Sequence, residues 1–173
     1  MKYNNMKKLI KSLLGPFLFA CLAAPSLALE AGQKAPNFSL DGAGSSVSLE
    51  AQAGKVVYVD FWASWCGPCR QSFPWLNEMQ KRYGAQGFTV IGVNLDKKHD
   101  DAEQFLAATP ARFTLAFDPA GKTPREWQVM GMPSSYIVGR DGRIRVLHSG
   151  FRDQDRAELE AGIQKALAEG ASK

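Results

Sequence analysis

The feature that most constrains this chain is an apolar run that is followed closely by a pair of cysteines. Residues 56–61 read Val-Val-Tyr-Val-Asp-Phe, and a nearly continuous run of β-branched and aromatic residues is typical of a strand buried on both faces of a sheet. Cys66 and Cys69 follow it and open a segment whose apolar residues Phe73 and Leu76 fall at helical spacing. The sequence therefore predicts that a central strand delivers both cysteines to the first turn of a helix.

Strand and helix patterns alternate along the rest of the chain. At its C-terminal end, Asp155 and Glu158 have the spacing of a capping box, which predicts a helix that begins near Asp155. The further predicted elements are a hairpin with its turn at residues 41–44, a strand at 88–93, helices at 100–108 and 123–129, and a hairpin made of 135–138 and 144–147. This order predicts an α/β protein with a central mixed β-sheet flanked by helices and an N-terminal β-hairpin extension.

The first 28 residues have the order of a secretory signal peptide. Residues 1–11 contain four lysines and no acid, residues 13–24 are uncharged and mostly apolar, and residues 26–28 read Ser-Leu-Ala. We therefore predict a signal peptide at residues 1–28 that is cleaved after Ala28. An uncleaved membrane anchor is one alternative, but a span needs about 20 apolar residues and prolines interrupt this run.

A second alternative is a lipoprotein. The residues before Cys21 resemble a lipid-attachment box, although Phe19 stands where a small or β-branched residue is usual. Cleavage after Ala28 removes Cys21 and leaves one domain at residues 29–173 with two cysteines. Because an export signal implies an oxidising compartment, we predict a periplasmic protein in which the two thiols either form a structural disulfide or carry out chemistry.

The charge of the predicted mature domain excludes one class of partner. The chain has a formal net charge of +4, but four of its 21 basic residues lie in residues 1–28, so 17 remain to balance 17 acidic residues. A neutral domain without a stripe of Lys and Arg lacks the electrostatic footprint of a nucleic-acid-binding protein. We therefore predict no nucleic-acid partner.

Two cysteines separated by two residues occur in metal sites, in structural disulfides and in redox centres. A metal site needs about four ligands, and the histidines, His99 and His148, stand isolated in the sequence. A structural disulfide of this spacing closes a loop too small to constrain the unfolded chain much. The redox centre fits best, because the free N–H groups and the dipole at a helix N-terminus stabilise a Cys66 thiolate and lower its pKa below the ordinary value of about 8.5. Cys66 is then the exposed nucleophile, and the more buried Cys69 attacks the mixed disulfide that Cys66 forms.

Several segments resemble the thioredoxin superfamily, over residues 32–168 in all. Residues 60–69 read Asp-Phe-Trp-Ala-Ser-Trp-Cys-Gly-Pro-Cys and resemble the active-site segment of thioredoxins. Residues 131–135 read Gly-Met-Pro-Ser-Ser and resemble the loop that contains a cis-proline in that family. The opening at residues 32–40 and the stretch at 92–96 are similar to those of exported TlpA-like and redoxin-type members. The resemblance implies a thioredoxin fold and thiol–disulfide oxidoreductase activity without a cofactor or a metal.

The same resemblance implies roles for individual residues. Pro133, in a cis peptide bond, is expected against the cysteine pair, where it leaves the backbone of Met132 free to pair with an extended client segment. Asp60 takes the position of a buried carboxylate whose raised pKa allows it to accept the Cys69 proton; the alternative is a hydrogen-bonded Asp without a catalytic role. The implied catalytic residues are Cys66, Cys69, Asp60 and Pro133, and the implied substrate-binding residues are Trp65, Gly67, Pro68, Gly131 and Met132.

One position departs from the thioredoxin pattern. Thioredoxins place a lysine near the buried carboxylate, on the next strand, whereas the matching residue here is Gly92. This difference leaves open the environment in which the Cys69 proton is transferred. Trp62, unlike Trp65, is expected in the core.

The two residues between the cysteines indicate the direction of electron flow. Gly67-Pro68 is the thioredoxin pattern and is typical of a comparatively reducing couple. We therefore predict a monomeric reductase that acts on protein disulfides and that a membrane-borne electron donor keeps reduced. Its predicted role is in cytochrome c maturation or in the service of another specific client. General disulfide oxidation or isomerisation is the alternative.

Two other functions fit the sequence less well. A peroxidase of the peroxiredoxin type needs a Thr three residues before the nucleophilic cysteine and a Pro further upstream, and these positions hold Ala63 and Val59. A binding module that keeps the fold without turnover has no need of both cysteines and the cis-proline loop, which are intact here.

Overall fold

The structure, a computed structural model, describes residues 28–169 and is built on a seven-stranded sheet with the order β2-β1-β5-β4-β3-β6-β7. Residues 1–27, which are the predicted signal peptide except for Ala28 and include Cys21, lie outside the described residues. No helix within residues 28–169 is long and apolar enough to cross a bilayer. The strands are β1 (Ser39–Gly42), β2 (Ser46–Ser48), β3 (Val56–Trp62), β4 (Phe88–Asn94), β5 (Thr114–Phe117), β6 (Ser134–Val138) and β7 (Ile144–Ser149), and the helices are α1 (Cys69–Tyr83), α2 (His99–Ala108), α3 (Thr123–Glu126) and α4 (Arg156–Ala168).

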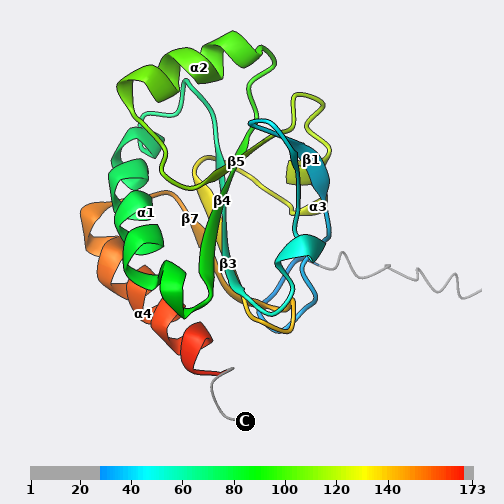
Figure 1. The fold of residues 1–173 in the computed structure, drawn as a ribbon, viewed down its shortest axis with the longest axis vertical. Helices are drawn as coiled ribbons and strands as arrows, with labels where there is room; N and C mark the ends of the chain where they lie inside the picture. Colours follow the sequence, from blue (N-terminus) through cyan, green and yellow to red (C-terminus); the bar gives the residue numbers. More distant parts are fainter. Residues whose placement is uncertain (1–27, 170–173) are drawn as a thin grey trace, which may run out of the picture.

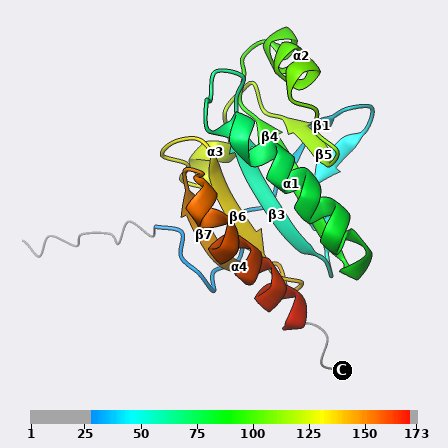
Figure 2. The ribbon, with the colours of Figure 1, turned by 90° about the vertical axis from the view of Figure 1, so that its left-hand side faces the viewer.

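β3 lies in the interior of the sheet, parallel to β4 on one side and antiparallel to β6 on the other. All of its residues are buried, and successive side chains of a strand point to opposite faces. Val57, Val59 and Phe61 therefore pack in one apolar cluster, whereas Val56 and Tyr58 pack in another with side chains of α1 and α4. Figures 1 and 2 show α1 and α4 side by side on that face of the sheet. The predicted central strand and the predicted α/β class are both confirmed.

The opposite face is closed by aromatic packing around Trp127, which is fully buried just after α3. Its ring lies 5.7 Å from that of Phe61 and 4.9 Å from that of Tyr136, measured between ring centroids. The Tyr136 hydroxyl donates a 2.6 Å hydrogen bond to the carbonyl oxygen of Trp127. Because Trp127 precedes the loop at residues 131–135 closely in sequence, this packing also fixes the start of that loop.

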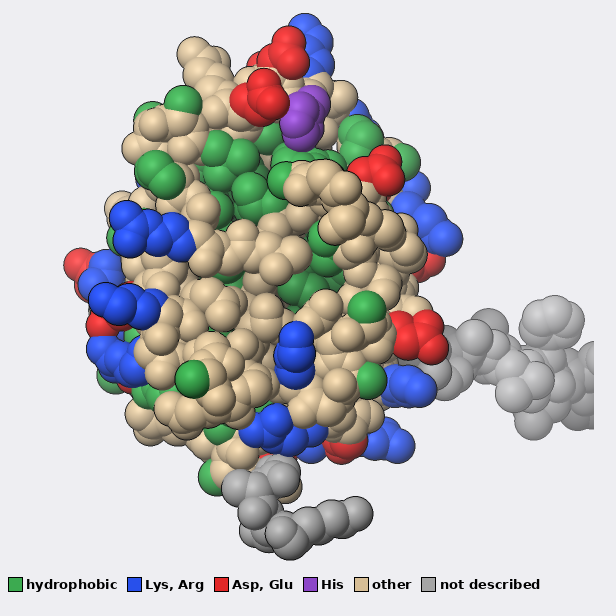
Figure 3. Space-filling view, in the orientation of Figure 1, with side chains coloured by type: hydrophobic (Ala, Val, Ile, Leu, Met, Phe, Trp, Pro, Cys, Tyr) green, Lys and Arg blue, Asp and Glu red, His purple; other side chains and the backbone are tan. Residues whose placement is uncertain are grey.

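The predicted N-terminal hairpin is present and extends the sheet, since β1 pairs with both β2 and β5 in antiparallel fashion. The strand to which it is joined, β5, was not predicted. β5 has only four residues, with an exposed Thr114 and a half-buried Leu115, so it lacks the continuous apolar run that identifies β3. Figure 3 shows apolar side chains gathered below α2, over the part of the sheet where Figure 1 places β5.

One predicted helix boundary and one predicted helix cap are wrong. The helix predicted at 123–129 ends at Glu126, and Gln128 has a positive φ of 54°, which a right-handed helix does not allow. The predicted capping box of Asp155 with Glu158 is absent, because Asp155 caps the preceding turn: its carboxylate accepts the Arg152 backbone N–H at 2.9 Å. The predicted start of this helix is confirmed, since Asp155 is the N-cap residue of α4, but its side chain does not cap the helix.

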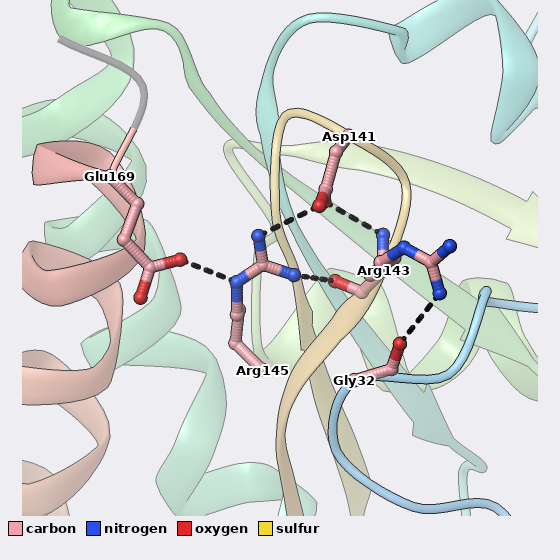
Figure 4. Close-up of polar contacts among 5 residues, drawn as sticks. All are labelled: Gly32, Asp141, Arg143, Arg145 and Glu169. Carbon is pink, nitrogen blue, oxygen red and sulfur yellow. Dashed lines mark hydrogen bonds and ion pairs between the residues drawn. The ribbon is translucent and has the colours of Figure 1, made fainter. Parts of the chain in front are cut away.

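Charged side chains tie the segment before β1 and the end of α4 to the turn between β6 and β7 (Figure 4). Arg145 of β7 donates to the carboxylates of Glu169, just after α4, and Asp141, in the turn. The guanidinium of Arg143 donates a 2.9 Å hydrogen bond to the carbonyl oxygen of Gly32. This network lies at the end of the sheet where β3 begins, so the opposite end, where the cysteines follow β3, is left to the functional site.

Candidate active site

A disulfide joins Cys66 and Cys69, whose Cα atoms are 5.4 Å apart. β3 ends at Trp62, a short irregular loop follows, and Cys69 is the first residue of α1. The Cys69 N–H donates a 3.3 Å hydrogen bond to the Cys66 sulfur. The predicted placement is confirmed: the central strand delivers the pair to the start of a helix, and the sulfur of Cys66 accepts a backbone hydrogen bond there. A thiolate at this position is stabilised by that bond and by the helix dipole.

Exposure differs sharply along the Cys-Gly-Pro-Cys segment. Gly67 and Pro68 are exposed, and 71% of the surface of Trp65 is accessible. Cys69 is fully buried and Cys66 is 3% exposed. The predicted order of burial is therefore confirmed, but the prediction of an exposed Cys66 is wrong for this disulfide-bonded form.

Cys66 is covered because both cysteines belong to one apolar cluster at the end of the sheet. Trp62 is fully buried in this cluster, as predicted, and Met132 packs against it. The loop predicted to lie against the cysteine pair thus reaches the same cluster as the pair, although the two segments are far apart in sequence. The other buried members are Phe73, Ala102 and Phe105.

The loop at residues 131–135 has the predicted cis peptide bond, between Met132 and Pro133. Pro133 is buried, Met132 is half-buried and Gly131 is exposed. The Gly131 carbonyl accepts a 2.7 Å hydrogen bond from the Ser134 hydroxyl, whereas the backbone N–H and C=O of Met132 have no hydrogen-bond partner among residues 28–169. These two unpaired backbone groups are what an extended peptide needs in order to pair with the loop.

Asp60 is buried in β3, with 1% of its surface exposed. It points to the same face of the sheet as Trp62, two residues on, and so faces the side where α1 and the cysteine cluster lie. Burial raises the pKa of Asp60 to about 7, while a 2.8 Å hydrogen bond from the Ser135 hydroxyl to Oδ1 opposes the shift. Its other oxygen, Oδ2, is buried and has no hydrogen-bond partner within the described part of the chain. The predicted rise in the pKa of this carboxyl is confirmed.

Gly92 lies directly beside Asp60, its partner in the parallel register of β3 and β4. A Cβ atom at Gly92 would come within 2.9 Å of the Phe113 ring and 3.2 Å of Leu115 and of the Trp62 indole nitrogen. Distances this short force neighbouring atoms to move. The strand position that supplies a lysine in thioredoxins is therefore filled here by neighbouring apolar side chains.

The described residues contain no group of three or more His, Cys, Asp and Glu side chains arranged to hold a metal ion. His99 lies 3.4 Å from Glu103 and His148 lies 3.4 Å from Asp155, each as a pair. Both histidines are engaged away from the cysteines, in contacts the sequence did not indicate.

The Redoxin family model matches residues 30–163. The chain belongs to this family. It is 33% identical over 145 residues to the thioredoxin-like protein YneN of Bacillus subtilis, covering 82% of this chain and 84% of that protein. It is 29% identical over 138 residues to the thiol-disulfide oxidoreductase ResA of Bacillus thuringiensis, covering 79% of each.

Among solved structures, the chain resembles a Chlorobium tepidum protein described as a thiol:disulfide interchange protein of the DsbE type. The TM-score is 0.79 and the sequence identity 55%, over 80% of this chain and 99% of that one. Together with the family match, this likeness confirms the thioredoxin fold. The protein is a thiol:disulfide oxidoreductase of the thioredoxin superfamily, and the clients of such an enzyme are protein thiols and disulfides.

Two polar residues of the site were missed in the sequence. Ser135 was noted as part of the cis-proline loop but not as the partner of Asp60. Asp96 was noted as part of a family-like stretch, yet its carboxylate accepts hydrogen bonds from Ser64, two residues before Cys66. One sequence signal could have indicated both residues. Each is a polar residue at the end of a buried apolar strand, and such a side chain needs a buried partner.

Proposed function

We propose that this protein is a periplasmic reductase of protein disulfides in which Cys66 attacks the client and Cys69 resolves the product. The observation that carries the proposal is the hydrogen bond from the Cys69 N–H to the Cys66 sulfur at the start of α1. This contact favours negative charge on Cys66, and the full burial of Cys69 disfavours a thiolate there until a proton acceptor is available.

The exchange proceeds in two balanced steps. The Cys66 thiolate attacks one sulfur of the client disulfide, so that a Cys66–client mixed disulfide forms and the other client sulfur leaves as a thiolate. The Cys69 thiolate then attacks Cys66 Sγ, which forms the Cys66–Cys69 disulfide and releases the second client sulfur. Two electrons pass from the cysteine pair to the client, and the client thiolates take up protons. The disulfide in the structure is the product of this cycle.

Asp60 is proposed to accept the proton that Cys69 must lose in the second step. A base works best when its pKa lies near the operating pH, and burial brings the pKa of Asp60 to about 7. Its free oxygen, Oδ2, is available for a proton, since the Ser135 hydroxyl occupies Oδ1.

The client is proposed to bind as an extended segment across the cis-proline loop. The unpaired backbone groups of Met132 supply the main-chain hydrogen bonds, and Pro133, which has no N–H, follows Met132 through a cis peptide bond. The exposed Trp65 provides an apolar contact beside the disulfide, and Gly67, Pro68 and Gly131 complete the exposed surface that a client approaches.

Reduction is the proposed direction, on the basis of the Gly67-Pro68 pair, which is typical of reducing couples. In an oxidising compartment such a protein needs a supply of electrons, so we propose a membrane-borne donor that reduces the Cys66–Cys69 disulfide. Apocytochromes in cytochrome c maturation are the proposed clients, and the protein is proposed to act as a monomer. Names such as thiol-disulfide oxidoreductase ResA among the relatives fit this role.

Export is proposed to depend on residues 1–28, with the mature domain at residues 29–173. A lipid anchor at Cys21 is the alternative that would keep the protein on the membrane.

The test of the function is a transfer of electrons to a defined client. The wild-type protein is first reduced and then mixed with a Cys-x-x-Cys-His peptide, the haem-attachment motif, in its disulfide form. We expect the peptide to become reduced while the Cys66–Cys69 disulfide re-forms in equal amount, and we expect no reduction by the variant with both Cys66→Ser and Cys69→Ser. A peptide that stays oxidised beside a protein that stays reduced would contradict the proposed direction.

A further inference from the structure

Ser64, two residues before Cys66, is held by charged side chains from two different elements. Its backbone N–H and its hydroxyl donate to the two carboxylate oxygens of Asp96, at 2.8 and 2.9 Å. Its carbonyl oxygen accepts a 3.3 Å hydrogen bond from the guanidinium of Arg70, in the first turn of α1. Hydrogen bonds thus hold the backbone N–H, the backbone carbonyl and the side-chain hydroxyl of Ser64.

The Asp96 carboxylate is itself fixed in place. It is 6% exposed and accepts a further 2.8 Å hydrogen bond from the side-chain amide of Asn94, the last residue of β4. The Asp96 N–H returns a 3.1 Å hydrogen bond to the Asn94 side-chain oxygen. The backbone of this segment is also bonded to the end of β3, because the Leu95 N–H donates to the Trp62 carbonyl oxygen at 2.9 Å. Asp96 is therefore a rigid extension of the central sheet.

Arg70, an exposed residue, is held by an aromatic contact on the other side of Ser64. Its guanidinium carbon lies 4.8 Å from the centre of the Phe105 ring, in a contact between a cation and an aromatic face that is itself favourable. Phe105 is buried in the same cluster as the two cysteines. The Ser64 anchor, defined as Asp96, Arg70 and their hydrogen bonds to Ser64, thus joins the sheet to α1 across the loop.

The anchor matters most when the disulfide is open. In the oxidised protein the bond to Cys69 fixes Cys66 beside α1. After reduction that bond is gone, and Cys66 is tied to its surroundings through its own N–H, which donates to the Ala63 carbonyl at 3.0 Å, and through the chain that the anchor holds. The N-terminal end of α1 stabilises the Cys66 thiolate only while the sulfur stays beside it.

We propose that Asp96 and Arg70 are positioning residues for thiol–disulfide exchange, which act by holding Ser64. The anchor keeps the reduced Cys66 at the N-terminal end of α1 and so stabilises the reduced form of the enzyme. The inference rests on the proposed function in one respect, since it takes the open cysteine pair as the working form. The proposal adds Asp96 and Arg70 to the residues that set the equilibrium between dithiol and disulfide. These two residues touch neither the client nor a cysteine sulfur.

The test compares Ser64→Ala with Ser64→Thr in a glutathione redox buffer. Ser64→Ala removes one hydrogen bond to a charged acceptor, and we expect the equilibrium between dithiol and disulfide to move at least about threefold toward the disulfide. Ser64→Thr keeps the hydroxyl and is expected to restore the wild-type ratio. The rate at which iodoacetamide alkylates the reduced protein at neutral pH should fall in Ser64→Ala for the same reason.

Asp96→Asn separates a positioning role from a purely electrostatic one. If Asp96 acted through its charge alone, its removal would relieve repulsion of the Cys66 thiolate and move the equilibrium toward the dithiol. The anchor predicts the opposite shift, toward the disulfide. Asp118→Asn is the matched control, because Asp118 is also a buried carboxylate and accepts the N–H groups of Gly121 and Thr123 at 2.9 and 2.7 Å, in another loop. It should lower stability without moving the equilibrium.

The inference is overturned if folded Ser64→Ala and Asp96→Asn keep the wild-type glutathione equilibrium, or if both move toward the dithiol. Ser64 is only half-buried, so Ser64→Ala is expected to fold, and its far-UV circular dichroism and thermal transition establish that it does. Neither readout uses a client, so a failure of the proposed reductase function leaves this result unaffected and is recognised separately in the peptide assay.

Discussion

The hydroxyl of Ser135 donates a 2.8 Å hydrogen bond to Oδ1 of Asp60, although the two residues are 75 positions apart in sequence. They face each other because β3 and β6 pair in a register that sets Asp60 opposite Ser135. Ser135 stands two residues after Pro133, so one strand joins the loop proposed to bind the client to the carboxyl proposed to accept the Cys69 proton. Most of the predictions below concern this carboxyl and the two cysteines of the site.

The stability of the oxidised protein should fall as the pH rises between 3.8 and about 7. Burial raises the pKa of Asp60 across this interval, so the folded protein keeps a proton that the unfolded chain has already released. The free energy of unfolding then decreases with rising pH, by up to about 4 kcal/mol once Asp60 is ionised. Urea unfolding at a series of pH values measures this slope, which should be much smaller in Asp60→Asn. Equal slopes in the two proteins would show that the carboxyl titrates near its ordinary value.

Asp60→Asn should leave the fold intact and slow the second step of exchange, in which Cys69 loses its proton. The expected loss is about 10²-fold, the usual contribution of a positioned base. Stopped-flow measurement of the release of the second client thiol isolates this step. A rate that stays within about twofold of the wild type between pH 6 and pH 9 would leave Asp60 with a structural role only.

Ser135→Ala should raise the pKa of Asp60 further, since the hydrogen bond from the Ser135 hydroxyl opposes the rise that burial causes. The pH dependence of the resolving step should move toward alkaline pH, with little change in its limiting rate. Ser135→Thr keeps a hydroxyl and serves as the control. An unchanged pH midpoint in Ser135→Ala would show that this bond does not govern the proton acceptor.

The two thiols should differ in reactivity once the disulfide is reduced. Cys66 accepts the N–H of Cys69 at the start of α1, whereas Cys69 is fully buried. Alkylation followed against pH should therefore reveal one reactive thiol with a lowered pKa, lost in Cys66→Ser and kept in Cys69→Ser. If both thiols react at equal rates, the helix terminus does not activate Cys66.

Export and processing should yield a mature chain that begins at Leu29. The small-x-small triplet at residues 26–28 after an apolar run is the reason for this expectation. The intact mass of the protein recovered from exporting cells measures the cleavage site. A diacylated chain that begins at Cys21 would establish the lipoprotein alternative in its place.

The features that the sequence predicted correctly are those that a local pattern determines. The apolar run of β3 and the cysteines after it can be recognised from a few consecutive residues. The family likeness at residues 131–135 indicated the cis bond at Pro133. The features it missed depend on register or on competition between partners. Asp155 fits a capping pattern with Glu158 in sequence, yet Arg152 binds its carboxylate in the folded protein.

The polar contacts inside the site are among the features that depend on register and that the sequence did not predict. No spacing rule links Asp60 to Ser135, because their contact follows from the pairing of β3 with β6. The bond between Ser64 and Asp96 likewise requires that the end of β4 lie beside the end of β3. The register is set by every residue of the paired strands together, and so these contacts emerge only with the complete sheet.

The central claim is the division of labour between the two thiols, and trapping tests it most directly. Among residues 28–169, Cys69 is the cysteine close enough to resolve the mixed disulfide quickly. Cys69→Ser expressed in the native compartment should therefore accumulate higher-mass adducts that disappear on reduction, while Cys66→Ser should not. Apocytochromes or a membrane reductant among the trapped partners would support the dedicated reductase, and a broad set of secreted proteins would favour general oxidation or isomerisation. If folded Cys69→Ser is present at the normal level and forms no adduct, the protein does not turn over protein disulfides through Cys66 and the account is contradicted.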